Sequence, residues 1–276
     1  MSVINTNVKS LVAQNAMTVN GRAMNKAMEQ LSTGSRINTA ADDAAGLAIS
    51  NKMTAQIRGL NQAVRNANDG ISMIQTAEGA TKEITNMLQR MRELAVQAAN
   101  DTNTTDDRAA LAKENDQLAE EITRIASNTS WNGMALFDGT SVGTAGKASF
   151  MVGANSGDST IDVTLQKVDA ATLKVDANKL DSTANAKSTI TAVDAALKTI
   201  DGFRADLGAK VNRLTYAGDN LMNVSQNTAA SRSRIQDTDY ATATTELART
   251  QIISQAATAM LAQANQQPQS VLSLLR

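Results

Sequence analysis

The residues whose types and spacing could most readily support catalysis are two adjacent carboxylates, Asp42 and Asp43. Paired carboxylates can divide acid and base roles when a positioned base, a metal or a pocket motif accompanies them. No such companion is recognisable around this pair, and the 276 residues include no His and no Cys. Imidazole catalysis, thiolate nucleophiles and the usual zinc sites are therefore excluded.

A helix cap accounts for the pair better than catalysis does. The run Thr39-Ala40-Ala41-Asp42 has the spacing of a capping box, which places carboxylates at the positive end of a helix. The neighbouring glycines, at positions 34, 46, 59 and 70, do not follow the spacing of a phosphate-binding loop. We predict no catalytic, cofactor-binding or metal-binding residue, and the chain is not expected to be an enzyme.

Charge and composition exclude further classes. Lys and Arg number 26 against 27 Asp and Glu, so the chain has no basic footprint for nucleic acid. No apolar run reaches the roughly 18 residues of a membrane span, and the first ten residues do not have the pattern of a cleaved secretory signal. Aromatic residues make up only 2% of the chain and hydrophobic residues 42%, which favours thin helical seams over a globular core.

The elements that position these residues are long helices. Residues 53–98 and 190–221 each repeat apolar residues in steps of three and four, which is typical of two helices that pack lengthwise. The first seam contains Met53, Ile57, Leu60, Val64, Ala67, Ile71 and Ile74. Beyond Ile74 the pattern resumes at Ala77, which predicts an extra three-residue step and a rotated face. The second half of this helix would then face more than one partner.

Shorter segments complete the layout. We predict an amphipathic helix over residues 3–31 that ends at Gly34, a helix over 108–127 that folds back along the first rod, and a last helix from Tyr240 onward. Residues 148–152 and 160–167 alternate as a half-buried β-hairpin. Pro268 is expected to break or kink the last helix. No charge occurs between Gln251 and Leu275, so the terminal helices would expose apolar seams unless other subunits cover them.

The predicted fold class is therefore mainly α, an elongated coiled-coil or helical bundle with a small β-hairpin insert between its N- and C-terminal halves. We divide the chain into a terminal helical domain of residues 1–42 and 237–276, a rod domain of 43–138 and 187–236, and an insert of 139–186. The terminal helices predict a subunit that becomes ordered on self-assembly.

Three stretches resemble bacterial flagellins. Residues 31–50, LSTGSRINTAADDAAGLAIS, are similar to the family signature, and 89–97, QRMRELAVQ, to its second N-terminal motif. The ending, QPQSVLSLLR, resembles the family's C-terminus. The resemblance implies a secreted protein that passes unfolded through the flagellar type III export channel and forms the extracellular filament for motility. The terminal helices would line the filament as an inner tube, and the rods would surround it. The insert is too short for large outer domains.

The resemblance also implies partners. They are other copies of the chain in a homopolymer, the flagellar cap, hook-filament junction proteins, a secretion chaperone, and host sensors of the Toll-like receptor and NAIP types. Gln89, Arg90, Leu94 and Glu114 match positions for subunit packing and for the Toll-like receptor. The terminal assembly seam contains Leu11, Leu31, Leu247, Val271, Leu272, Leu274 and Leu275, of which the last four match the leucine-rich ending seen by NAIP-type sensors.

These residues also have purely structural interpretations. The charged residues on the first rod can be a solvated face, and the terminal leucines a stripe that packs within the inner tube. A hook-filament junction protein of the same export system is the alternative function, since it shares the terminal helices. A metallopeptidase insert, which some flagellins carry, needs the His residues that this chain lacks.

Overall fold

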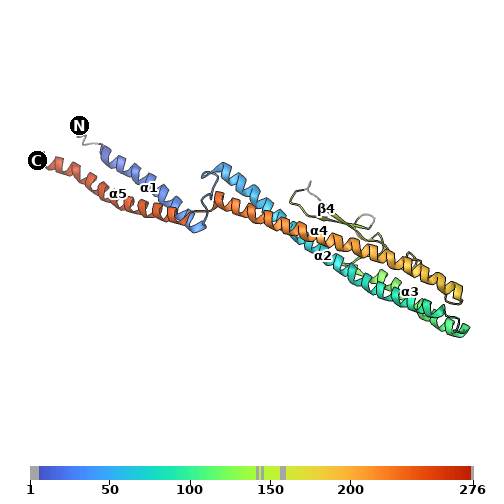
Figure 1. Ribbon diagram of the computed structural model, residues 1–276. Coiled ribbons are helices and arrows are strands. Elements are labelled where there is room, and N and C mark those ends of the chain that lie inside the picture. The colour runs from blue at the N-terminus through green and yellow to red at the C-terminus, as the bar shows by residue number, and fades with distance from the viewer. Residues whose placement is uncertain (1–5, 141–142, 144–145, 156–159, 275–276) are drawn as a thin grey trace. The chain divides into compact units, whose positions relative to one another are not determined.

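The computed structural model describes residues 6–140, 143, 146–155 and 160–274, with the backbone alone for 267–274. Within these residues there are five helices: α1 Val8–Thr33, α2 Ala44–Ala98, α3 Thr105–Asn128, α4 Thr183–Gln236 and α5 Tyr240–Leu274 (Figure 1). The described residues also form two antiparallel strand pairs, β1 Ser130–Trp131 with β2 Met134–Ala135, and β3 Lys147–Met151 with β4 Thr160–Thr164. The mainly α class with a small β insert is confirmed.

The chain divides into two compact units. Unit 1 comprises residues 1–55 and 227–276, and unit 2 comprises 56–226. In unit 1, α1 and α5 pair antiparallel, because Asn7 contacts Ala264 while Asn20 contacts Thr250. The two connectors of unit 1 are joined as well: Ser35 forms a β-bridge with Asp237, and the Arg36 guanidinium donates to the Ile235 carbonyl at 2.6 Å, near the end of α4.

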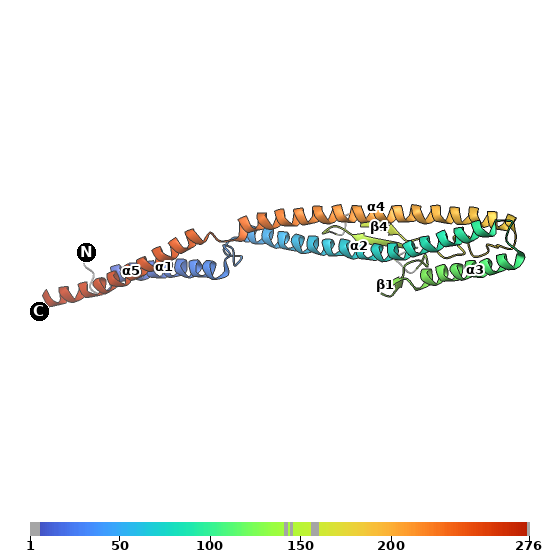
Figure 2. The same cartoon turned by 60° about the horizontal axis from the view of Figure 1, so that its bottom comes forward.

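Unit 2 is built on α2 and α4, which lie side by side in both cartoon views (Figures 1 and 2). Helix α3 folds back along α2 as predicted, and its Ala119, Ile122 and Ala126 belong to the main hydrophobic core of unit 2, together with residues of α2 and α4. The β3–β4 hairpin covers another part of that core through Ile161 and Val163. The predicted hairpin is thus confirmed, with Phe150 opposite Ile161.

The seam of α2 differs from the prediction. A continuous line of its buried residues runs in steps of three and four through unit 2, at Leu60, Ala63, Ala67, Gly70, Ile74, Ala77, Thr81, Ile84, Leu88, Met91, Ala95 and Ala98, with Met73, Thr85 and Leu94 buried beside it. The expected extra step near Ile74 is therefore wrong. It arose because Val64 and Ile71 flank the buried face, while the small residues Ala63 and Gly70 lie on it.

Glycine is required at this seam by close packing. A Cβ atom on Gly70 would lie 3.1 Å from Phe150 Cδ1 and 3.2 Å from Leu214 Cδ1. These distances are shorter than ordinary carbon–carbon contacts. The absence of a side chain at Gly70 therefore lets the hairpin and α4 approach α2 together.

Three helix ends refine the predictions. Helix α1 ends at Gly34, in the left-handed region at φ +70°, as expected, and begins at Val8; residues 3–5 of the predicted helix lie outside the described residues. Helix α2 begins after Asp43, whose Oδ1 accepts from the Gly46 amide at 2.8 Å, so the predicted box at Thr39 is one turn too early. Of the predicted break or kink at Pro268, the break is wrong, because α5 continues to Leu274.

Candidate assembly surfaces

The carboxylate pair has structural roles in unit 1. Asp43 caps α2, and Asp42 accepts hydrogen bonds from the Thr39 amide and hydroxyl, each at 3.0 Å. Lys26 of α1 lies 2.8 Å from Asp42. The Lys26 ammonium, followed by the Thr39 donors, holds the pKa of the Asp42 carboxyl well below its usual range. Asp42 therefore locks the connector against α1 as a carboxylate.

The uncovered surface of unit 1 carries several large apolar side chains among polar ones. Among the described side chains, the exposed large hydrophobic ones are Val8, Leu11, Val12, Val19 and Met28 on α1 and Tyr240, Ile252, Ile253 and Met260 on α5. Val12 is 64% exposed and Met260 66% exposed, and both line a groove of about 350 Å³. Exposed apolar faces of this extent are typical of surfaces that pack against another protein.

The residues of the predicted terminal seam differ in exposure where their side chains are described. Leu11 is 56% exposed, whereas Leu31 and Leu247 are half-buried. Val271, Leu272 and Leu274 belong to the helical backbone of α5, with side chains outside the description, and Leu275 lies outside the described residues.

The second predicted cluster, on α2 and α3 of unit 2, separates into a surface part and a core part. Gln89 is exposed, and the Arg90 guanidinium bonds to Glu114 at 2.9 Å and to Glu93 at 3.0 Å. Glu93, then Glu114, raise the pKa of Arg90. Leu94, in contrast, is 1% exposed. The structure therefore brings Gln89, Arg90 and Glu114 to the surface and places Leu94 beneath them.

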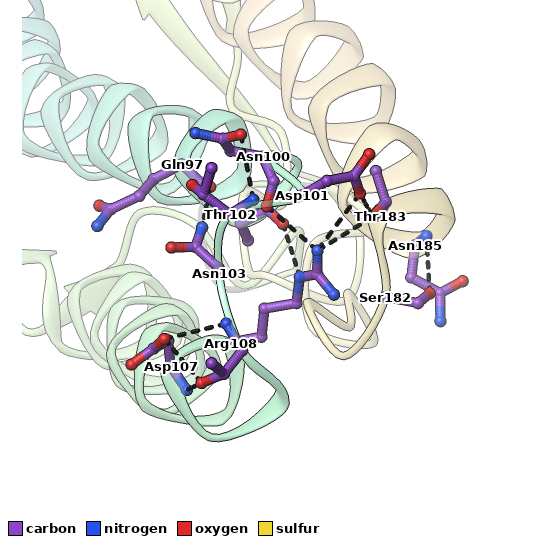
Figure 3. Close-up of polar contacts among 12 residues, drawn as sticks. Gln97, Asn100, Asp101, Thr102, Asn103, Asp107, Arg108, Ser182, Thr183 and Asn185 are labelled. Atoms are coloured by element: carbon purple, nitrogen blue, oxygen red, sulfur yellow. Dashed lines mark hydrogen bonds and ion pairs between the residues drawn. The ribbon is translucent and has the colours of Figure 1, made fainter.

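Two cross-links of unit 2 carry no periodic signal and were missed in the sequence. Arg92 Nε donates to Asp194 Oδ1 at 2.7 Å, which joins α2 to α4. Arg108 Nε donates to the Ala98 carbonyl at 3.0 Å, near the end of α2, and its Nη2 donates to Thr183 Oγ1 at 3.1 Å, at the start of α4 (Figure 3). From the sequence alone, an arginine on a helix surface is predicted to be solvated, because the carbonyls that it contacts come close only in the folded chain.

The described residues contain no group of three or more Asp or Glu side chains that could hold a metal ion. None of their helices is long and apolar enough to cross a membrane. Paired helices with uncovered apolar faces define a class of helical structural subunits that pack against other protein chains.

Comparison with known proteins identifies the family within this class. Residues 4–142 match the bacterial flagellin N-terminal helical region, and residues 190–275 match the bacterial flagellin C-terminal helical region. A flagellin of Halalkalibacterium halodurans is 51% identical over 276 residues, covering 99% of this chain and 100% of that protein. The chain therefore belongs to the bacterial flagellin family.

More distant relatives agree. Flagellin A of Vibrio cholerae is 36% identical over 379 aligned residues, covering 99% of both chains, so the present chain is a short form. The crystal structure of Bacillus cereus flagellin has 32% sequence identity and a TM-score of 0.52, covering 61% of this chain and 94% of its own. A putative flagellar hook-associated protein from Vibrio parahaemolyticus shares the fold, with a TM-score of 0.59, 16% identity, and coverage of 71% of this chain and 100% of that chain.

The protein is thus a structural subunit that self-assembles into the extracellular bacterial flagellar filament, and it is not an enzyme. The flagellin of Halalkalibacterium halodurans matches over the full length at 51% identity, whereas the hook-associated protein is similar at the level of fold alone. These comparisons do not favour the junction-protein alternative.

Proposed function

We propose that α1 and α5 form the inner layer of the filament and that the α2–α4 rods form the layer around it. In this proposal residues 1–42 and 237–276 are the terminal domain, 43–138 and 187–236 the rod domain, and 139–186 the insert. The observation that carries it is the exposed apolar face of the terminal pair, with Val12 and Met260 more than half exposed. Burial of these side chains between copies would supply the hydrophobic driving force for polymerisation.

Truncation tests this division of labour. Deleting residues 3–31 or 251–276 is expected to abolish polymerisation while leaving unit 2 folded, because the core of unit 2 is formed by residues 67–214. Circular dichroism checks the fold, and elongation of preformed filament seeds checks assembly. Truncated chains that elongate seeds at the full-length rate would contradict the proposal.

The same apolar face supports further partners. Before assembly it needs a cover, which is the task of a secretion chaperone, and at the filament ends it would meet the cap and the hook-filament junction proteins. A matched pair of variants separates this surface from the rest: Val12→Ser is expected to weaken chaperone binding in calorimetry, whereas Tyr216→Ser, which changes a side chain that is 75% exposed on α4, is expected to leave it unchanged.

Recognition by host sensors is a second proposed role, favoured by the exposed Gln89–Arg90–Glu114 cluster. Arg90→Ala is expected to weaken Toll-like receptor binding. Arg124→Ala is the control, because Arg124 is also exposed and paired with a glutamate on its own helix. Leu94 would act from beneath, by supporting the helix surface. Equal receptor binding by the Arg90→Ala and Arg124→Ala variants would contradict the proposed receptor surface.

For the NAIP-type sensors, the candidate contacts are Val271, Leu272, Leu274 and Leu275, and replacing them together by Ser should abolish sensor activation.

A further inference from the structure

The pairing of α1 with α5 buries small and polar side chains. Among the residues of these two helices whose side chains are described, the buried ones are Ser10, Asn20, Ala27, Ala243 and Thr250. Larger side chains on the same two helices, Met17, Met24 and Leu31 on α1 and Leu247 and Leu261 on α5, are only half-buried. Because the fully buried side chains of this pair are small or polar, the hydrogen bonds of the buried polar groups are a further source of its alignment.

One source is the amide of Asn20. Its side chain is 9% exposed, and its Nδ2 donates to the Thr250 carbonyl of α5 at 2.8 Å. Thr250 is itself 1% exposed, and its hydroxyl donates back to the Glu246 and Leu247 carbonyls of its own helix. A slip of α1 along α5 would bury the Asn20 amide without this partner, which is unfavourable.

The second source lies thirteen residues earlier in α1. Asn7 caps α1, since its Oδ1 accepts from the Ser10 amide at 3.1 Å, and its Nδ2 donates to the Ala264 carbonyl of α5 at 2.8 Å. In a continuous helix the Ala264 carbonyl would accept from the amide of residue 268. That residue is Pro268, which has no N–H to donate. Asn7 thus supplies the donor that the proline removes.

We propose that Asn7 and Asn20 are positioning residues that set the alignment of α1 on α5, and that Pro268 creates the acceptor that Asn7 recognises. The observed alignment places Asn7 at the one α5 carbonyl that lies four residues before a proline, and a slip of one turn would move it away from that acceptor. This alignment decides which apolar side chains of the two helices form the outward face. The proposal therefore deepens the assembly role of the terminal pair and rests on it.

A double-mutant cycle tests the link between Asn7 and Pro268. Asn7→Ser keeps a good helix cap and shortens the side chain, so the bond to Ala264 is lost. We expect it to raise the critical concentration for polymerisation of the full-length chain roughly tenfold, the equivalent of one lost hydrogen bond. Pro268→Ala restores an N–H to the Ala264 carbonyl, so in that background the penalty of Asn7→Ser should fall below about twofold.

Asn20→Ser is the matched control, because its partner Thr250 is remote from Pro268 and its penalty should persist in the Pro268→Ala background. Alignment is read directly in filaments from spin labels at Asn25→Cys and Gln266→Cys, two exposed positions in a chain without native cysteine. A slip of one turn would shift their separation by about 5 Å. The proposal is overturned if Pro268→Ala fails to rescue Asn7→Ser, including the case in which neither polymerises, or if it rescues Asn20→Ser equally. Failure of the wild-type chain to polymerise would instead count against the assembly role.

Discussion

Replacing Leu94 by Ala tests whether the α2 surface rests on its own core. Leu94 is 1% exposed in unit 2 and packs in a cluster with Ala95, Ala98, Leu180 and Ala186. The substitution removes three carbons, worth about 2.4 kcal/mol of transfer free energy at 0.8 kcal/mol each, and leaves a cavity between helices that cannot fully collapse. The expected loss in the free energy of unfolding is about 3 to 4 kcal/mol.

The assay uses the single tryptophan. Trp131 is half-buried and packs against the main core of unit 2, so its fluorescence follows the urea unfolding of that unit in the soluble full-length chain. Val96→Ala is the control, because Val96 lies two residues away on the same helix and is 50% exposed. It should change the free energy by no more than about 0.5 kcal/mol.

Coincident unfolding midpoints for the two variants would refute the reasoning, since they would mean that Leu94 contributes no more than a surface residue. A loss of the expected size has a further consequence. Any weakening of receptor binding by Leu94→Ala would then have to be compared with the loss of helix packing before it is assigned to a contact.

Two other perturbations have defined outcomes. The lowered pKa of Asp42 means that its contribution to the stability of unit 1 is fully present above about pH 4, the ordinary value for an unfolded aspartate, and is lost as the pH falls further. Asp42→Asn should abolish this pH dependence, measured as the exchange protection of the Asn38 and Thr39 amides. An exchange profile that the substitution leaves unchanged would contradict the role of Asp42 in holding the connector. Gly70→Val should destabilise unit 2 by about 1 to 3 kcal/mol through its clash with Phe150, whereas Gly79→Ala, whose added Cβ would meet nothing within 4 Å beyond its own stretch of helix, should be neutral or stabilising by up to about 1 kcal/mol in the same urea assay.

Periodicity predicted most of the fold. The helices, the return of α3 along α2 and the hairpin pairing all follow from apolar spacing and turn residues, which act locally. The seam of α2 was placed less well, because Gly70 and Thr81 are buried although their side chains are small or polar. Burial at such positions depends on the partner helix, so it cannot be predicted from the apolar pattern of α2 alone.

The candidate site was predictable in part for the same reason. Exposed Leu11 and the surface position of Arg90 follow from the pattern and the family resemblance. The roles of Arg108 and Asn7 do not, because each depends on carbonyls that come close only in the folded chain. Pro268 gave a misleading signal: a proline costs a helix one hydrogen bond, and here an amide from α1 replaces the missing donor.

The Arg108 junction also has a consequence for sliding between α2 and α4. Its guanidinium joins the end of α2 to the start of α4, and Asp101 accepts from the same Thr183 hydroxyl at 2.9 Å (Figure 3). Sliding α4 past α2 would stretch both contacts, whereas bending the two helices together would stretch them less. We expect these contacts to resist sliding at this end of the unit, which suits a subunit of a filament that is turned from one end.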